Sequence, residues 1–269
     1  MFFPLQYHYM NQHLGEIVKR ITKEGYSTIS AQFSATRQTP WVDFDYLKTY
    51  INKGSNVLDL GCGNGRLWST LRSYQDLRYT GIDANTHFIQ AAVETYVVDK
   101  DRTNFVAGDL SNIRSLLAQD EQFDVVTMIA SFHHLVSERE RLELLQWVHD
   151  HLRPGGVLFM TNWNLLRLDV RKKSMWRYAV MRVFDEDYKD FLSSRGINSS
   201  LVFSFKDVFT IWQSGTDRVL LYYYAFRAGE IERLCHEAGF LDNKSFYAKR
   251  GVASRWWNGE NLITIAKKT

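Results

Sequence analysis

The sequence predicts an α/β fold: a doubly wound, mostly parallel sheet with helices on both faces. Three segments carry that prediction, at residues 57–60, 79–83 and 123–134. Each is short and largely apolar, as strands in the middle of a sheet are. A helical pattern follows each segment, and this alternation of strand and helix is typical of parallel sheets.

Length and composition limit the classes of protein to consider. The 269 residues suit one large domain, or one domain with an inserted lobe, and 45% hydrophobic content is ordinary. Cys62 and Cys235 are far apart and give neither a disulfide framework nor a zinc-ligand cluster, which favours a reducing compartment. No apolar run reaches membrane-spanning length. We therefore expect a cytoplasmic protein without a bound metal; its net charge of +3 permits nucleic acid as a partner but does not argue for it.

The N-terminal part, residues 1–40, is expected to be a helical lead-in to the sheet. Its apolar residues fall on one face of a helix: Leu14, Ile17, Val18 and Ile21. Gly25 is expected to end that helix. A polar segment ending in Pro40 follows, and a short helix begins at Trp41.

A glycine-rich turn, Asp59-Leu-Gly-Cys-Gly-Asn-Gly65, follows the first strand. Glycines let a ligand approach the backbone, and the next helix offers free N–H groups there, so the turn is typical of a nucleotide or nucleoside cradle. Arg66 occupies the third position of the dinucleotide pattern G-x-G-x-x-G, which excludes that pattern. The alternative is a turn that binds nothing, which is disfavoured because three glycines in five residues cost stability.

Carboxylates end the next two strands. Asp83 lies 22 positions after Gly61, where the acid that binds a ribose diol belongs in a doubly wound sheet. Asp109 ends the strand at residues 104–110. It is either a second ligand-binding acid or a turn or helix-cap residue, since Ser111 follows directly.

Two histidines, His133 and His134, stand at the carboxyl end of the strand at residues 123–134. Ligands of open α/β sheets bind at that edge, so both are candidates to face a substrate. Alternatively, one of them packs at the sheet edge and holds a loop.

A capping box at residues 137–140 then opens a helix, RPGG at 153–156 ends it, and a strand follows at 157–163.

Residues 164–224 interrupt the alternation and are too long for a plain loop, so we expect an inserted substrate lobe. The expected division is a lead-in at 1–40, a cofactor-binding core at 41–163, the lobe at 164–224, and a helix with two strands at 225–269. The final helix places Cys235 on its buried face, as a small core residue.

The run DLGCGNG followed by GID resembles the class I S-adenosylmethionine-dependent methyltransferases, as does the helix–RPGG–strand unit. The resemblance implies a Rossmann-like, seven-stranded sheet ending in an antiparallel hairpin. It implies S-adenosylmethionine as cofactor, with the glycine turn against its methionine part, Asp83 on the ribose and Asp109 on the adenine amino group. The cofactor-binding residues so implied are Asp59, Gly61, Cys62, Gly63, Asn64, Gly65, Asp83, Ala84, Asp109, Leu110 and Ala130.

Three further runs, QFSATRQTPW, SFHHLVSERERLELL and DVFTIWQSGTDRVLLYYYAFRAGEIERL, resemble the tRNA methyltransferases that esterify 5-carboxymethyluridine at the wobble position. This resemblance extends from about Tyr26 to the end of the chain. It implies tRNA as the substrate and, as in the eukaryotic family, a small zinc-bearing partner protein. Gln38 replaces a usual aromatic and Tyr224 a usual histidine; both are expected near the substrate.

A carboxylate acceptor is ionised at neutral pH and needs no strong base, but it needs a cation to position it. Arg37 is expected to hold it at two points, with His133 and His134 orienting the acceptor. Alternatively, Arg37 binds phosphate or forms a surface ion pair.

Two rival functions remain: a small-molecule carboxyl, O- or N-methyltransferase, and a non-catalytic binding protein. Aromatic residues of the lobe closing the pocket would favour a small molecule, and an open basic entrance would favour tRNA.

Overall fold

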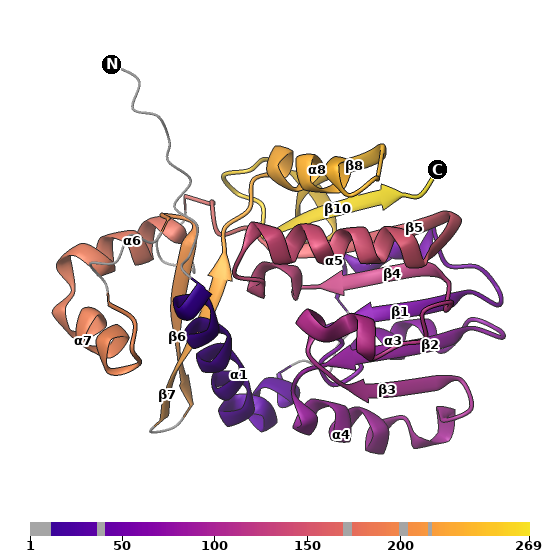
Figure 1. The fold of residues 1–269 in the computed structure, drawn as a ribbon, viewed down its shortest axis with the longest axis horizontal. Coiled ribbons are helices and arrows are strands. Elements are labelled where there is room, and N and C mark those ends of the chain that lie inside the picture. Colours follow the sequence, from indigo (N-terminus) through magenta and orange to yellow (C-terminus); the bar gives the residue numbers. More distant parts are fainter. Residues whose placement is uncertain (1–11, 37–40, 169–173, 199–203, 215–216) are drawn as a thin grey trace.

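An eight-stranded sheet forms the centre of the molecule (Figure 1). The structure is a computed structural model that describes residues 12–36, 41–168, 174–198, 204–214 and 217–269. The strands run in the order β3-β2-β1-β4-β5-β10-β8-β9. Their bounds are β1 Asn56–Leu60, β2 Arg78–Asp83, β3 Thr103–Ala107, β4 Phe123–Ile129, β5 Leu152–Trp163, β8 Asp242–Lys249, β9 Val252–Ser254 and β10 Asn261–Lys267.

The first five strands pair in parallel, and the last three pair antiparallel. The predicted mostly parallel sheet with an antiparallel end is therefore confirmed. The predicted number of seven strands is wrong by one, because the short strand β9 adds to the edge. Arg250 and Gly251, with φ of 50° and 75°, form a two-residue turn that returns the chain along β8.

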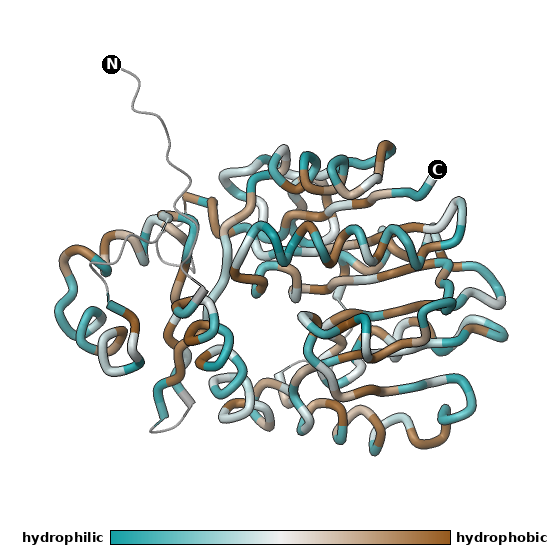
Figure 2. The backbone as a smooth tube through the Cα atoms, in the orientation of Figure 1, coloured by the Kyte–Doolittle hydropathy of each residue, from teal (hydrophilic) through white to brown (hydrophobic). Residues whose placement is uncertain are grey.

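Helices cover both faces of the sheet: α2 Phe44–Lys48, α3 Arg66–Leu71, α4 Thr86–Thr95, α5 Glu138–His151 and α8 Ala228–Glu237, with short 3₁₀ turns η1 Val97–Asp99, η2 Leu110–Ser115 and η3 Phe132–His134. Successive strand residues point to opposite faces. Leu58 therefore packs under α5 and α8, while Val57 packs with α2 and α3. Hydrophobic stretches run along β1 and β4 at the centre of the sheet, while α5 carries large hydrophilic stretches (Figure 2).

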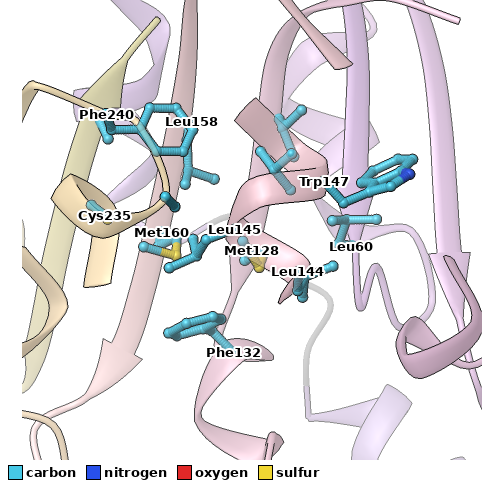
Figure 3. Packing of buried hydrophobic residues seen from close by; sticks show 14 of the residues in the cluster. Leu60, Met128, Phe132, Leu144, Leu145, Trp147, Leu158, Met160, Cys235 and Phe240 are labelled. Atoms are coloured by element: carbon cyan, nitrogen blue, oxygen red, sulfur yellow. The ribbon is translucent and has the colours of Figure 1, made fainter. Parts of the chain in front are cut away.

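The core beneath α5 and α8 is built from leucines, methionines and aromatic rings (Figure 3). Cys235 is fully buried in it, which confirms its expected place, and burial raises the pKa of its thiol to about 12. The Ser137 hydroxyl accepts a hydrogen bond from the Glu140 N–H at 3.1 Å, so the predicted helix start is observed.

A second body of structure faces the carboxyl ends of the parallel strands. It comprises α6 Met175–Phe184, α7 Glu186–Ser194 and the hairpin of β6 Asp207–Ser214 with β7 Asp217–Tyr224. Helix α1, Gln12–Ala35, lies between this hairpin and the main sheet (Figure 1). Buried residues of α1 and of the hairpin share one core. The division into these four segments stays a prediction.

The prediction that Gly25 ends the first helix is wrong. Helix α1 continues to Ala35, and Gly25 lies against β7. A Cβ at Gly25 would stand 2.9 Å from the carbonyl oxygen of Leu220 and 2.9 Å from a methyl of Leu221. Glycine is thus required for close helix–strand packing and not as a stop. Within the described ranges, none of the helices is long and apolar enough to cross a membrane.

Candidate active site

A cavity of about 250 Å³ lies where β1, β2 and β4 end, with α1 on its other side. Of the predicted site residues, it brings together Asp59, Gly61, Cys62, Gly63, Asn64, Asp83, Ala84, Asp109, Leu110, Ala130 and His134. Gly65 and His133 lie outside its lining. Arg37 falls outside the residues that the structure describes.

The three glycines of the turn all have positive φ, but they serve different purposes. A Cβ on Gly61 would come within 2.3 Å of the Ser131 Cβ, and a Cβ on Gly65 would meet the rings of Phe105 and Tyr96. A Cβ on Gly63 would meet no protein atom within 4 Å. Gly61 and Gly65 are therefore needed for packing, while Gly63, which lines the cavity, has open space where a Cβ would stand.

The Asp83 carboxylate is held by the backbone. One oxygen accepts a hydrogen bond from the Gly63 N–H at 2.9 Å, and the other accepts one from the Asn85 N–H at 2.8 Å. Burial raises the pKa of Asp83 above its ordinary value, and these two N–H groups counteract that rise. Because a carboxylate offers about four acceptor positions, it retains capacity for the two hydroxyls of a ribose.

Asp59 lies beneath the turn and ties three strands together. Its oxygens accept hydrogen bonds from the Tyr79 hydroxyl of β2 and the Thr127 hydroxyl of β4, both at 2.7 Å. It is 1% exposed, and burial raises the pKa of its carboxyl to about 6. Both oxygens are thus already bonded within the sheet.

Asp109 is a helix cap and a cavity residue at once. One carboxylate oxygen accepts hydrogen bonds from the Ser111 N–H at 2.9 Å and the Ser111 hydroxyl at 2.8 Å. The capping alternative is therefore observed. Asp109 also lines the cavity, so its role as a cap is compatible with a contact to adenine. That contact stays a prediction.

The two adjacent histidines have different surroundings. His134 lines the cavity: its Nδ1 lies 2.7 Å from the Tyr222 carbonyl oxygen and its Nε2 lies 3.1 Å from the Tyr26 hydroxyl. A carbonyl only accepts, so a neutral His134 carries its proton on Nδ1 and accepts from Tyr26 at Nε2. The Tyr26 hydroxyl also lies 3.2 Å from that of Tyr223. His133 is fully buried behind this group, with its Nδ1 accepting from the Trp163 N–H.

One wall of the cavity comes from α1, which the sequence reasoning did not place there. Its contributions are Lys19, Thr22, Lys23, Tyr26 and Phe33. Most of these recur at helical spacing, and continuing the helix past Gly25 would have shown them as one stripe. The Lys19 ammonium lies 2.8 Å from a Glu140 carboxylate oxygen, while Lys23 forms no ion pair with any described residue.

The expectation that Tyr224 lies near the substrate stays a prediction, and the cavity lining does not support it. Tyr224 does not line the cavity, and its hydroxyl donates to the Glu230 carboxylate at 2.8 Å. The Arg141 guanidinium stacks 3.6 Å from its ring centroid. Because side chains alternate along β7, Tyr223 faces the His134 side in its place.

Aromatic rings form much of the cavity wall, and none of them comes from the described residues of the lobe at 164–224. The rings are those of Tyr26, Phe33, Trp41, Phe44, Phe88 and Trp163. Trp212 of β6 packs behind Phe33, at 6.3 Å between centroids. Two lysines of α1 share the same cavity, so it is neither purely aromatic nor an open basic cleft.

Residues 57–156 match the family model described as a methyltransferase domain. This segment is an S-adenosylmethionine-dependent methyltransferase domain. In this methyltransferase the matched residues begin in β1 and end within β5, so they contain the glycine turn and both acids that end β2 and follow β3. S-adenosylmethionine is the cofactor, and the open space at Gly63 and the acceptor capacity of Asp83 fit it.

Among curated proteins, the methyltransferase is 32% identical to the tRNA (carboxymethyluridine(34)-5-O)-methyltransferase of Saccharomyces cerevisiae over 141 residues, 52% of this chain and 47% of that protein. Across relatives of that name, the chain spans between 21% and 59% of their length.

Two solved structures show the same fold at low identity. One is described as a DhpI-SAM-HEP complex, with TM-score 0.58, 18% identity and coverage of 94% of this chain and 97% of that one. The other is a putative methyltransferase of Haloferax volcanii in complex with the Trm112 methyltransferase activator, with TM-score 0.54, 15% identity and coverage of 92% and 97%. At these identities the likeness concerns the fold alone.

Proposed function

We propose that this methyltransferase forms the methyl ester of 5-carboxymethyluridine at the wobble position of tRNA. The observation that carries the proposal is that one cavity contains both the glycine turn with Asp83 and a cation, Lys23, that forms no ion pair with any described residue. A carboxylate acceptor needs such a cation close to the cofactor. The relatives that bear this activity in their names, at 26–32% identity, support the choice of acceptor.

The reaction places modest demands on the protein. When bound against the glycine turn and Asp83, S-adenosylmethionine would supply an electrophilic methyl group for transfer to the acceptor carboxylate. The acceptor is already ionised at neutral pH, so the protein need not remove a proton. Its residues position the acceptor and exclude water.

Each wall of the cavity has a part in this scheme. Lys23 attracts the acceptor carboxylate, and the fixed ring of His134 with the Tyr26 hydroxyl shapes the wall beside it. Arg37 is proposed as a second, two-point contact to the carboxylate. In the sequence, Arg37 comes two residues after Ala35, the last residue of α1.

A small-molecule carboxyl, O- or N-methyltransferase is the second candidate, and the aromatic wall favours it. Six aromatic rings line the cavity, which is the composition of many small-ligand sites. The same rings would equally stack on a uracil base, so the wall does not separate the two candidates. The non-catalytic alternative is disfavoured, because the Gly63 opening and the oriented Asp83 carboxylate are both intact.

The small zinc-bearing partner protein stays a prediction from the family resemblance, as does the cytoplasmic location. Copurification of such a protein with this chain, at equal stoichiometry and with higher turnover, is the expected outcome. Turnover of the isolated chain that is unchanged by the partner would contradict it.

The experiment that tests the proposed function compares two acceptors. Radiolabelled methyl transfer is measured onto bulk tRNA carrying 5-carboxymethyluridine and onto a small-metabolite extract, followed by nucleoside mass spectrometry. We expect label in tRNA that mild base releases as methanol, since an ester hydrolyses where a ring or ribose methyl does not. Label only in metabolites, or base-stable label in tRNA, would reject the proposed ester.

A further inference from the structure

The loop between β9 and β10, residues 255–260, presents two tryptophans to solvent. Trp256 is 44% exposed and Trp257 is 39% exposed. Their rings meet edge to face, with centroids 5.8 Å apart and planes at 89°. Two adjacent exposed indoles form an apolar surface, and its exposure to water does not stabilise the fold. Such surfaces are typical of binding sites.

The loop is held in place from beneath. Asn164, which is 1% exposed, donates hydrogen bonds from its side-chain amide to the carbonyl oxygens of Trp256 at 2.6 Å and Gly259 at 2.9 Å. The Asn258 side chain accepts from the Arg255 N–H at 3.2 Å and closes the turn. The two rings are therefore presented by a fixed backbone, which lowers the entropy lost on binding.

The loop stands at the same edge of the sheet as the cavity. Asn261, the first residue of β10, pairs with Trp163, the last residue of β5, and Trp163 lines the cavity. A second connection runs through Asp43, whose carboxylate accepts from the Asn261 side chain and from the Gly251 N–H. The tryptophan loop and the cavity thus share structural supports.

A cation lies beside the two rings. Arg255 is exposed and belongs to the same loop, Lys249 and Arg250 stand at the turn between β8 and β9, and Glu260 is the one acidic residue of the loop. The Arg255 guanidinium lies 5.0 Å from the centroid of the Trp257 ring. Rings that stack on bases beside cations that attract phosphates are the combination by which proteins bind single-stranded nucleic acid.

We propose that Trp256, Trp257 and Arg255 form a stacking platform for the unpaired bases of an RNA loop beside the methyl-transfer cavity. This deepens the proposed function and rests on it, since the wobble base lies in such a loop. The platform binds RNA outside the cavity and orients the loop, while the cavity receives one nucleotide. Single-strandedness is what it recognises, because paired bases expose no face for stacking.

The test is direct binding, with no methyl transfer required. The probes are a 17-nucleotide anticodon stem–loop RNA and a blunt RNA duplex of the same length, each measured by fluorescence anisotropy at several salt concentrations. The variants are the double substitution Trp256→Ala with Trp257→Ala, and Phe184→Ala as a control that removes another exposed ring, 79% exposed on α6. Cofactor affinity and the melting temperature verify that each variant is folded.

We expect the double variant to bind the stem–loop at least ten-fold more weakly, with duplex binding and the Phe184→Ala variant unchanged. Trp257→Phe should retain most of the affinity, and Arg255→Gln should reduce the salt slope by about one phosphate contact. Unchanged stem–loop affinity, equal loss for stem–loop and duplex, or no RNA binding by the wild type would overturn the platform. Unchanged stem–loop affinity would instead indicate that the two rings bind a protein partner.

The result is separable from the fate of the proposed function. Stem–loop binding that depends on the tryptophans, without methyl transfer to tRNA, would reject the ester reaction and keep the platform. If the double variant methylates tRNA with the same KM for tRNA as the wild type, the platform is rejected and the proposed reaction stands.

Discussion

The two walls of the cavity are made in different ways. The cofactor wall, where we propose that S-adenosylmethionine binds, is built from residues close together in the sequence. They are three glycines within five residues and the acids that end β2 and follow β3. The facing wall is assembled from distant parts of the chain, since Tyr26 meets His134 and Tyr223 across 108 and 197 positions. The first wall is fixed by backbone geometry and the second by side-chain packing on α1. They should therefore respond differently to substitution.

The largest expected effect separates two glycines of the cofactor wall. Gly61→Ala should destabilise the fold by about 3 kcal/mol, because a positive φ is combined with a contact of 2.3 Å to Ser131. Gly63→Ala should cost only about 1 kcal/mol of backbone strain, because its Cβ meets no protein atom, yet it should weaken cofactor binding. Chemical denaturation and calorimetric titration of S-adenosylmethionine measure the two effects. Equal losses of stability in both variants would remove the distinction between packing and ligand glycines.

Asp59 gives the cofactor wall a dependence on pH. Its folded pKa of about 6 is above the ordinary value of 3.8, so its contribution to stability is complete below about pH 4 and is lost as the pH rises through 6. Asp59→Asn does not titrate. The wild type should therefore lose roughly 2 kcal/mol of unfolding free energy between pH 4.5 and 7.5 that the Asp59→Asn variant does not lose.

Denaturant unfolding at the two pH values measures this difference, with the exposed Asp120→Asn as the matched control. Parallel pH profiles of the wild type and the Asp59 variant would show that the buried carboxyl does not titrate as described.

Asp83→Ala tests the ribose contact. The variant should bind S-adenosylmethionine at least ten-fold more weakly, about 1.4 kcal/mol or more, because it loses an ionised acceptor that the Gly63 and Asn85 N–H groups hold in place. Calorimetry measures the affinity, and Asp109→Ala offers a comparison with the second acid. Unchanged affinity in the Asp83 variant would reject the assignment.

The smallest expected effect is on the facing wall. Tyr26→Phe removes the hydroxyl between His134 and Tyr223 and should lower kcat/KM by about five-fold to ten-fold, the worth of one hydrogen bond, while cofactor affinity stays the same. Single-turnover methyl transfer beside a cofactor titration separates the two quantities. A loss of cofactor affinity as large as the loss of turnover would mean that the two walls are not separable.

The contrast between the walls also explains what the sequence could predict. The glycine turn, Asp83 and the parallel sheet follow from spacing and periodicity within a few dozen residues, and the structure brings them to one cavity. Gly25 misled the prediction of helix α1, because a glycine that allows close packing on β7 is indistinguishable in the sequence from a helix stop. With the helix ended there, its cavity-facing stripe could not be recognised.

Two further features depend on strand pairing. Tyr224 differs from its neighbour Tyr223 only by the alternation of a strand whose register depends on pairing with β6. Strand β9 has three residues and exists because a turn at Arg250 and Gly251 returns it to β8. Local periodicity in the sequence does not determine which strands pair, so both features became visible only in the folded structure.

The central claim is that the glycine turn and Asp83 form the cofactor site, with α1 facing it across one cavity. A crystal structure of the protein with S-adenosylhomocysteine tests this most directly. We predict the ribose hydroxyls within hydrogen-bonding distance of the Asp83 carboxylate and the amino acid part against residues 61–63. A ligand bound elsewhere, or bound with its ribose away from Asp83, would contradict the account.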